Sequence, residues 1–229
     1  MRQRRGRRAR NRCERRRASG AGREPVTALD LNDICVVGND TGGTVVQLLA
    51  VDHPARLSSV VITDCDAFEN LPPTLFKYLC WLARLPPAFG LAMRSMSIRP
   101  LQRSPLAFGW LTKHGVPRPV AEHYVSLFRR SGATRADLIR FLRGVNNRPT
   151  LRIAGQFQHV ALPTLVAWSK DDRVFPYEHA QRLSALIAEA GLVTCEDSYA
   201  YLPFDQTSWL AGQIKQFATA NVIKQANKH

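Results

Sequence analysis

The chain has 229 residues, of which 45% are hydrophobic and 22% are charged. This composition is typical of a globular protein with a sizeable core and excludes a chain that is disordered throughout. The formal net charge of +14 suggests nucleic-acid binding, but residues 1–23 hold eleven Arg and one Glu and therefore carry +10 of it. The remaining residues carry about +4, which is unremarkable for an enzyme.

Residues 1–23 form an Arg-rich arm without an apolar run, so they are neither a secretory signal nor a membrane span. Charge repulsion predicts that this arm is disordered. It is either a polybasic segment that binds nucleic acid or anionic lipid, or an incidental extension. We favour the extension, because an Arg run without aromatic residues or a nucleic-acid-binding motif carries little specificity.

Elsewhere the chain has no apolar run of about 18 residues, the length that a membrane span needs. The five cysteines are scattered without the CxxC spacing of a metal or redox site, so we expect a reduced, cytoplasmic protein with no metal and no cofactor. Cys35, Cys65 and Cys195 fall in apolar segments, where a buried thiol acts as a small hydrophobic side chain.

The first predicted elements alternate between short apolar strands and a helix. Residues 34–37 (ICVV) form a strand, residues 44–51 form a helix that Pro54 ends, and residues 59–63 (SVVIT) form the next strand. Such alternation is typical of a parallel sheet that is buried on both faces. We therefore predict an α/β fold with a mostly parallel sheet.

Residues 68–149 have a different pattern, with helical segments, paired prolines and many aromatic residues, which predicts an all-helical insertion. The alternating pattern then resumes. We expect strands at 163–168 and 192–195, helices at 178–190 and 207–220, and a tail at 221–229. The α/β core accordingly consists of residues 24–67 and 150–220.

The chemistry concentrates at a Gly-rich turn at residues 38–43 (GNDTGG), between the first strand and its helix. A sharp strand-turn-helix exposes one side chain, here Asp40, above the sheet and points the next N–H, that of Thr41, at a developing oxyanion. The small residues that permit this turn are Gly38, Gly42 and Gly43. A phosphate-binding loop is the alternative, but the turn lacks the Lys and the spacing of such loops.

This turn resembles the nucleophile elbow of the α/β-hydrolase superfamily, and its Asp40 resembles the Asp-nucleophile branch, which includes haloalkane dehalogenases and soluble epoxide hydrolases. The resemblance covers about residues 30–218, and the insertion matches the cap of that family. It implies a carboxylate that attacks carbon to form an ester, which activated water then hydrolyses. A carboxylate suits the first step because it is ionised at neutral pH.

The resemblance also implies a catalytic acid after the strand that follows the cap. Residues 169–176 (SKDDRVFP) match the family pattern with Asp172 as the acid and Asp171 as its alternative. A second known placement, after the strand that follows the elbow, nominates Asp64 or Asp66.

The sequence departs from the family at the catalytic base. Residues 197–206 correspond to the stretch that carries the histidine, and Ala200 stands at its expected place. General-base help is worth about 10²–10⁴-fold in rate, so ester hydrolysis without it is slow. Four of the six histidines are poorly placed to replace this base: His53 and His159 should face away from the site, His179 lies in the helix after the acid, and His229 is terminal. His114 and His123 lie in the cap, from which they can descend over the site.

Two further departures narrow the function. Thr41 stands where dehalogenases of this kind place a halide-binding tryptophan, which weakens the dehalogenase interpretation. The strands and the oxyanion loop that precede the elbow in the family are absent, which leaves the strand at 34–37 as an edge. Three explanations of the missing strands remain: the chain is a fragment, it forms a homo-oligomer through the edge from Ile34 to Val37, or it is a pseudoenzyme. Residues 24–33 favour the fragment, because they resemble the end of the helix that leads into the elbow strand.

The sequence therefore predicts a truncated α/β-hydrolase that acts on a small apolar substrate through an ester on Asp40, because the cap is rich in Phe, Leu and Trp. The alternative is a non-catalytic hydrolase-like protein or fragment whose polybasic arm binds polyanions. Two roles are open for the three tyrosines Tyr124, Tyr199 and Tyr201. They donate a hydrogen bond to an oxygen of the substrate, or they are structural residues.

Overall fold

The computed structural model describes residues 30–52 and 55–226. The Arg-rich arm, residues 24–29, His53 and the last three residues, His229 included, lie outside the described residues. The predictions about them are therefore untested.

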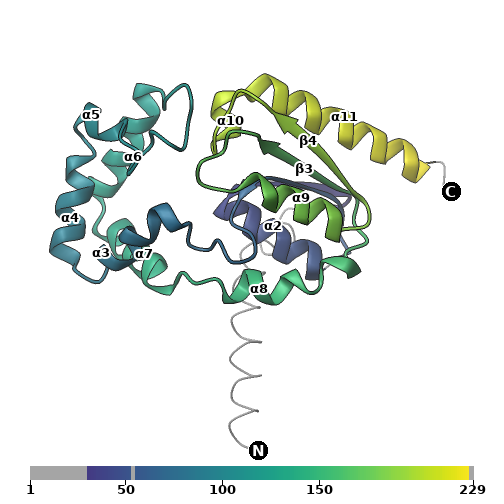
Figure 1. The fold of residues 1–229 in the computed structure, drawn as a ribbon, viewed down its shortest axis with the longest axis horizontal. Coiled ribbons are helices and arrows are strands. Elements are labelled where there is room, and N and C mark those ends of the chain that lie inside the picture. The colour runs from purple at the N-terminus through teal and green to yellow at the C-terminus, as the bar shows by residue number, and fades with distance from the viewer. Residues whose placement is uncertain (1–29, 53–54, 227–229) are drawn as a thin grey trace, which may run out of the picture.

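A four-stranded parallel sheet forms the centre of the protein (Figure 1). Its strands are β1 (Ile34–Asp40), β2 (Leu57–Cys65), β3 (Thr164–Ser169) and β4 (Ala190–Cys195), in the spatial order β1-β2-β3-β4. The predicted parallel α/β architecture is confirmed. Because all four strands run in the same direction, their carboxyl ends meet at one edge of the sheet, where the turn after β1 also lies.

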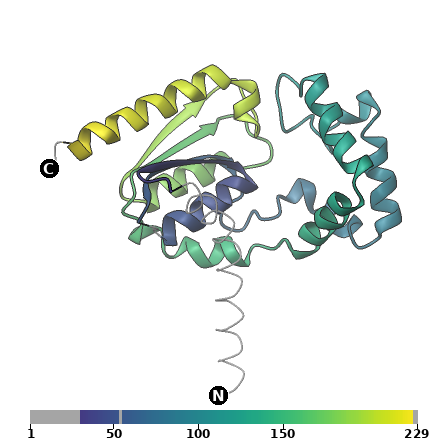
Figure 2. The ribbon, with the colours of Figure 1, turned by 180° about the vertical axis from the view of Figure 1, so that it is seen from behind.

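Helices cover both faces of this sheet, as Figures 1 and 2 show from opposite sides. The alternation of side chains along β3 defines the two faces, because Val166 and Trp168 belong to one core cluster and Ala167 to another. The first cluster includes side chains of α2 (Thr41–Asp52), α8 (Arg148–Ala154) and α9 (Tyr177–Leu186). The second includes side chains of α10 (Leu202–Asp205) and α11 (Thr207–Ala226).

The two central strands are buried along their whole length or nearly so, which explains the apolar runs at their centres, VVI in β2 and LVAW in β3. Trp168 is completely buried in β3, and its indole N–H donates to the main-chain oxygen of Phe175 at 3.1 Å. That bond ties the loop after β3 to the strand itself. The loop carries Asp171 and Asp172, so their positions are fixed by the core.

Between β2 and β3 the chain forms helices beside the sheet (Figure 1). These are η1 (Thr74–Phe76), α3 (Lys77–Leu82), α4 (Pro86–Ser95), α5 (Arg99–Gln102), α6 (Arg118–Arg130), α7 (Gly132–Gly144), α8 and η2 (Phe157–His159). Several have a proline in the first or second position, where the helix leaves the N–H groups unpaired and the missing N–H of proline costs no hydrogen bond. These helices have their own small core, in which the rings of Phe89 and Phe128 lie 5.8 Å apart edge to face.

Most elements have bounds that differ from the sequence prediction by a few residues, and the differences at α9 and β4 have a physical reason. The helix predicted at 178–190 ends at Leu186, and Ile187 is already extended. The last strand begins at Ala190 rather than at residue 192, because Ala190 and Gly191 pair with Thr164 and Leu165 of β3. Alanine and glycine are weak strand formers, so this start depends on pairing with a strand that lies far away in the sequence.

Candidate active site

The backbone at Asp40 has the left-handed conformation, with φ of 54°. Asp40 is the last residue of β1, and α2 begins at Thr41 without an intervening loop. The main-chain N–H of Thr41 donates to Oδ1 of Asp40 at 2.6 Å, and the Thr41 hydroxyl donates to the same atom at 3.2 Å. The predicted strand-turn-helix therefore exists, and a non-glycine residue in this conformation is a strain that is common at functional sites.

Two of the three turn glycines are required by close packing. A Cβ atom on Gly38 would lie 2.5 Å from the main-chain oxygen of Gly42, and one on Gly43 would lie 2.3 Å from Cβ of Cys65. A Cβ atom on Gly42 would meet nothing within 4 Å. Gly38 and Gly43 thus let the helix start pack against β1 and β2, whereas Gly42 has no such steric role.

Asn39, which the sequence did not single out, connects the turn to two other loops. Its side-chain amide donates to the main-chain oxygens of Asp64 and Ala200, both at 3.0 Å. Asp64 is the next-to-last residue of β2, and Ala200 follows β4, so one side chain of β1 joins the ends of three strands. The only local signal is a polar residue inside the Gly-rich turn, and it does not identify partners so far along the chain.

The two alternative acids, Asp64 and Asp172, lie next to each other. Oδ1 of Asp64 accepts from the N–H of Ser169 at 2.8 Å, and Oδ1 of Asp172 accepts from the N–H groups of Val174 at 2.7 Å and Phe175 at 3.0 Å. Asp172 is partly exposed as a residue, but its Oδ2 is buried, as is that of Asp64, and neither atom has a donor among the described residues. A proton shared between the two carboxyls would satisfy both atoms.

Burial raises the pKa of both carboxyls, and the negative charge of Asp172 raises the pKa of Asp64 further. The backbone hydrogen bonds of Phe175 and Val174 oppose this effect on the pKa of Asp172. The pair therefore keeps a proton at a pH at which an exposed aspartate has lost it.

Asp66 is a third buried carboxyl near Asp40. Its main-chain oxygen accepts from the side chains of Thr44 at 3.0 Å and Gln47 at 2.9 Å, both on α2. Burial, together with the negative charge of Asp40, raises the pKa of Asp66 to about 8. Burial also raises the pKa of Asp40, against the hydrogen bonds from Thr41. Asp40 thus lies among carboxyl groups.

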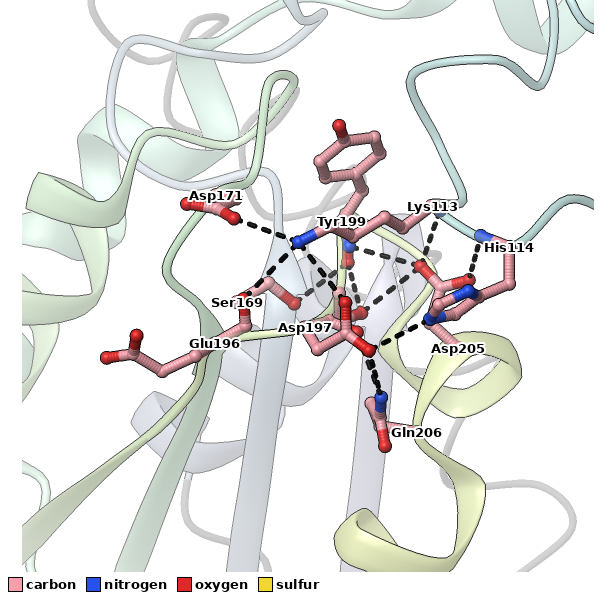
Figure 3. A network of polar contacts seen from close by, with 10 residues as sticks. Lys113, His114, Ser169, Asp171, Glu196, Asp197, Tyr199, Asp205 and Gln206 are labelled. Atoms are coloured by element: carbon pink, nitrogen blue, oxygen red, sulfur yellow. Dashed lines mark hydrogen bonds and ion pairs between the residues drawn. The ribbon is translucent and has the colours of Figure 1, made fainter.

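Asp171 is not part of this buried group. It is exposed, and its Oδ2 lies 3.1 Å from Nζ of Lys113, which lies 3.2 Å from Oδ1 of Asp197 (Figure 3). The ring of His114 contacts Oδ2 of Asp197 at 3.2 Å. Hydrogen bonds from Lys113 lower the pKa of Asp197, and those to Asp171 and Asp197 raise the pKa of Lys113. This network joins the helical insertion to the loops after β3 and β4.

Asp205 completes the network from the start of the C-terminal helices. Its carboxylate accepts from the main-chain N–H groups of Lys113 at 2.7 Å, His114 at 3.1 Å and Tyr199 at 3.1 Å (Figure 3). The N–H of Tyr201 donates to the main-chain oxygen of Leu111 at 2.7 Å. The segment that carries Ala200 is thereby fastened to the insertion on both sides.

The place expected for a catalytic histidine holds Ala200, which is completely buried. No hydrogen bond joins a histidine of the described residues to Asp40, Asp64 or Asp172. Each of them lies elsewhere: His114 binds Asp197, His123 is exposed on α6, His159 is exposed in η2, and His179 packs on Phe68 with its ring 3.5 Å from Glu69. Burial lowers the pKa of His179.

Of the three tyrosines, Tyr201 has a pKa that is affected by the charge of Asp40. Burial and then the charge of Asp40 raise the pKa of Tyr201, with a smaller effect from Tyr124. Tyr199 instead lies beneath Arg173, whose guanidinium carbon is 4.7 Å from the centre of its ring. The structure thus separates Tyr201 from Tyr199, although they are two residues apart.

Two cavities of about 660 and 610 Å³ lie among the described residues of the insertion, and Asp40 lines neither. The first lies around the loop at residues 108–117, and the second between α4, α6 and α7. In the part of the chain that the structure describes, no three His, Cys, Asp or Glu side chains are grouped to hold a metal ion. Every helix there is too short or too polar to cross a bilayer.

Residues 26–206 match the family model described as alpha/beta hydrolase fold. Solved structures with the same fold include an esterase from Exiguobacterium antarcticum (TM-score 0.64, 15% identity, 88% of this chain and 72% of the other). An alpha/beta hydrolase fold protein from Burkholderia ambifaria aligns with TM-score 0.69, 17% identity and coverage of 87% and 71%. A meta-cleavage product hydrolase from Pseudomonas fluorescens aligns with TM-score 0.60, 14% identity and coverage of 85% and 68%. None of the curated proteins matches.

Proposed function

Because the chain belongs to the alpha/beta hydrolase fold family, we propose that it is a hydrolase that acts on a small apolar substrate through an ester on Asp40. One observation carries this proposal. Asp40 has left-handed backbone at the junction of β1 and α2, and its carboxylate accepts the N–H of the next residue at 2.6 Å. This conformation holds the side chain of a nucleophile above the sheet edge.

In the first step an oxygen of the Asp40 carboxylate attacks an electrophilic carbon of the substrate. A carbon–oxygen bond forms as the bond to the leaving group breaks, and the leaving group departs with the electron pair. This step needs no base, but it does need Asp40 in its ionised form.

In the second step water attacks the carbonyl carbon of the ester. The oxyanion that forms is an oxygen of Asp40 itself, so the N–H of Thr41 lies where that charge develops. The proton of the attacking water passes to a base, for which we nominate Asp172. The tetrahedral intermediate then collapses, the bond from its carbon to the alkoxy oxygen breaks, and the alcohol leaves with the proton that Asp172 returns. Asp40 is restored as a carboxyl group, which releases its proton to solvent. The charge of Asp40 acts on the pKa of Asp172, and Asp64 shares the proton of that carboxyl.

The absence of an imidazole at Ala200 makes this second step the slow one. A carboxylate is a weaker base than imidazole, and general-base catalysis by a well-placed group is worth about 10²–10⁴-fold. We therefore expect the ester on Asp40 to accumulate after the protein meets an alkylating substrate.

Intact-protein mass spectrometry after exposure to a short alkyl bromide or a terminal epoxide tests this proposal. The expected result is one adduct, mapped to Asp40 by peptide sequencing and lost in Asp40→Asn. Asp137→Asn is the matched control, because Asp137 is an exposed carboxylate on α7. Well-folded protein without an adduct on Asp40 would falsify the Asp-nucleophile proposal.

A non-catalytic hydrolase-like protein is the second candidate, and one observation favours it. The segment at the expected base is held by structural contacts, since Ala200 is buried and its main-chain oxygen binds Asn39. This candidate predicts no adduct on Asp40 with any electrophile. The polybasic arm would then be its binding element, and retention on an anionic resin should fall when residues 1–23 are deleted.

The free edge of β1 supports the proposal of a homo-oligomer. In the described part of the chain, β1 pairs with β2 alone and lies at the end of the sheet. Pairing with a second copy would complete its main-chain hydrogen bonds. Sedimentation of the full chain as a monomer at micromolar concentration would exclude this assembly.

A further inference from the structure

The charge of the helical insertion is far from neutral. Residues 68–149 hold 13 Lys and Arg but only 3 Asp and Glu, a net charge of +10. The total of about +4 outside the Arg-rich arm is therefore the balance between this basic insertion and residues 24–67 and 150–229, whose net charge is −6. Between residues 70 and 121 there is no acidic residue at all.

The same part of the chain exposes large apolar side chains. Trp81 is 60% exposed and Leu91 is 72% exposed. The others are Leu85, Ile98, Leu101 and Leu106. A single exposed leucine needs no explanation, but six large exposed apolar side chains within 26 residues form a cluster along the sequence that does need one. We call residues 81–106 the basic-apolar segment.

Cationic and apolar side chains alternate along this segment at helical spacing. Arg84 and Leu85 follow Trp81 by three and four residues, across the end of α3, where the N–H of Arg84 still donates to the oxygen of Trp81. On α4, Arg94 follows Leu91 by three residues. Residues three and four apart lie on one side of a helix, so Leu91 has a guanidinium beside it on α4, and Trp81 has one at the end of α3.

The cavities of the insertion combine the same two kinds of side chain. Leu91 and Arg94 line the cavity of about 610 Å³ together with Arg129 and Arg135. Arg99 and Arg103 line the cavity of about 660 Å³. No Asp or Glu lines either cavity. Both hollows therefore favour an anionic group.

We propose that the basic-apolar segment docks on the surface of an anionic lipid bilayer. Arginines bind the phosphate groups of the lipids, while Trp81, Leu91 and their apolar neighbours enter the boundary between head groups and acyl chains. A nucleic acid would satisfy the arginines but would leave the leucines in water. Each cation near such a surface strengthens binding by about fivefold.

The position of the segment permits this docking. Figure 1 shows α3, α4 and α5 on the side of the insertion away from α11 and the far end of the sheet. The proposal does not depend on whether Asp40 is a nucleophile. A hydrolase at such a surface would meet apolar substrates that partition into lipid.

Fluorescence quenching by vesicles with brominated acyl chains tests the proposal with the full chain. Residues 1–23 contain no tryptophan, so binding through the Arg-rich arm cannot produce the signal. We expect quenching with vesicles of phosphatidylcholine and phosphatidylglycerol, its loss in Trp81→Phe, and its retention in Trp209→Phe on α11. Quenching should be absent with vesicles of phosphatidylcholine alone.

Substitutions then separate the two contributions. Leu91→Asp should abolish quenching, whereas Val222→Asp, at an exposed apolar position of α11, should not. Arg94→Gln should weaken vesicle binding about fivefold. Arg140→Gln should not, because that arginine is paired with Asp137 at 2.8 Å. Circular dichroism confirms that each variant is folded.

Three results would overturn the proposal. Vesicle binding without quenching shows that only the arm binds. Equal quenching with neutral vesicles removes the role of the arginines. Vesicle binding that Leu91→Asp leaves intact, combined with RNA binding that Arg94→Gln weakens, assigns the segment to nucleic acid.

Discussion

The side-chain amide of Asn39 lies 3.0 Å from the main-chain oxygen of Ala200, although 161 residues separate the two in the sequence. The residue before the candidate nucleophile thus holds the segment in which the resemblance to Asp-nucleophile hydrolases predicts a catalytic base. The same amide binds the main-chain oxygen of Asp64, so the elbow, a buried carboxyl and the base position are one connected unit.

Asn39→Ala should lower the free energy of unfolding by about 1–3 kcal/mol, because it leaves two main-chain oxygens without their donor. Urea denaturation measures this loss. Asn32→Ala is the control, since the exposed amide of Asn32 makes only a local bond to Asp30 and should change stability by less than about 0.5 kcal/mol. Equal effects of the two substitutions would contradict the role of Asn39.

Gly43→Ala and Gly42→Ala should have opposite outcomes. The new methyl group at residue 43 would overlap Cβ of Cys65 and force α2 away from β2, at a cost of about 1–3 kcal/mol or more. At residue 42 there is open space, and alanine is the better helix former, so stability should stay equal or rise by up to about 1 kcal/mol. Thermal unfolding of both variants checks this pair, and a stable Gly43→Ala protein would show that the close approach is wrong.

Asp205→Ala should destabilise the junction between the insertion and the core. Three main-chain N–H groups lose a charged acceptor. Each hydrogen bond to a charged group stabilises the folded state by about 1.5–3 kcal/mol, and water that binds the freed N–H groups recovers part of this free energy. Hydrogen exchange at Lys113, His114 and Tyr199 should accelerate, while exchange in β3 stays slow. Asp137→Ala removes only an exposed pair and should leave these amides protected.

The buried carboxyl of Asp66 should make stability fall as pH rises. Its folded pKa of about 8 lies above the ordinary value of 3.8, so between these values the folded state binds a proton that the unfolded chain has released. The contribution of Asp66 to the free energy of unfolding is therefore complete below pH 3.8 and is lost as the pH rises toward 8. Between these two values the free energy of unfolding falls by about 1.4 kcal/mol per pH unit because of this group. Asp66→Asn should remove that slope, and parallel curves for the two proteins from pH 5 to pH 8 would refute the assignment.

Adduct formation on Asp40 should also depend on pH. Burial raises the pKa of Asp40, and only the ionised carboxylate attacks carbon, so the rate should increase with pH until the group is fully ionised. The rate of adduct formation measured by mass spectrometry should level off above an apparent pKa higher than 3.8. A rate that is already maximal at pH 4 would mean that Asp40 is not desolvated.

The sequence was sufficient where local physics decides the structure. β2 and β3 carry apolar runs at their centres because they are buried on both faces, and the Gly-rich turn after β1 marks the place where Asp40 takes its left-handed backbone. It was insufficient for β4, whose first residues are Ala190 and Gly191, because their strand conformation comes from pairing with β3.

The candidate site shows the same division. Sequence patterns nominated Asp40, Asp64, Asp171 and Asp172, but only tertiary structure could place Asp64 beside Asp172 and Asp171 in the network of Lys113. Burial and polar contacts between residues 58 and 105 positions apart separate these carboxyls, and no local pattern records such contacts.

The sequence by itself thus determined the parallel α/β fold, the turn with Asp40 and the absence of a histidine at Ala200. Those features follow from residue identity, apolar periodicity and glycine geometry, which act over a few residues. Tertiary structure alone decided which carboxyls are buried together, that Asn39 joins three strand ends, and which leucines of the insertion remain exposed. These properties depend on which surfaces lose their water when distant segments pack together.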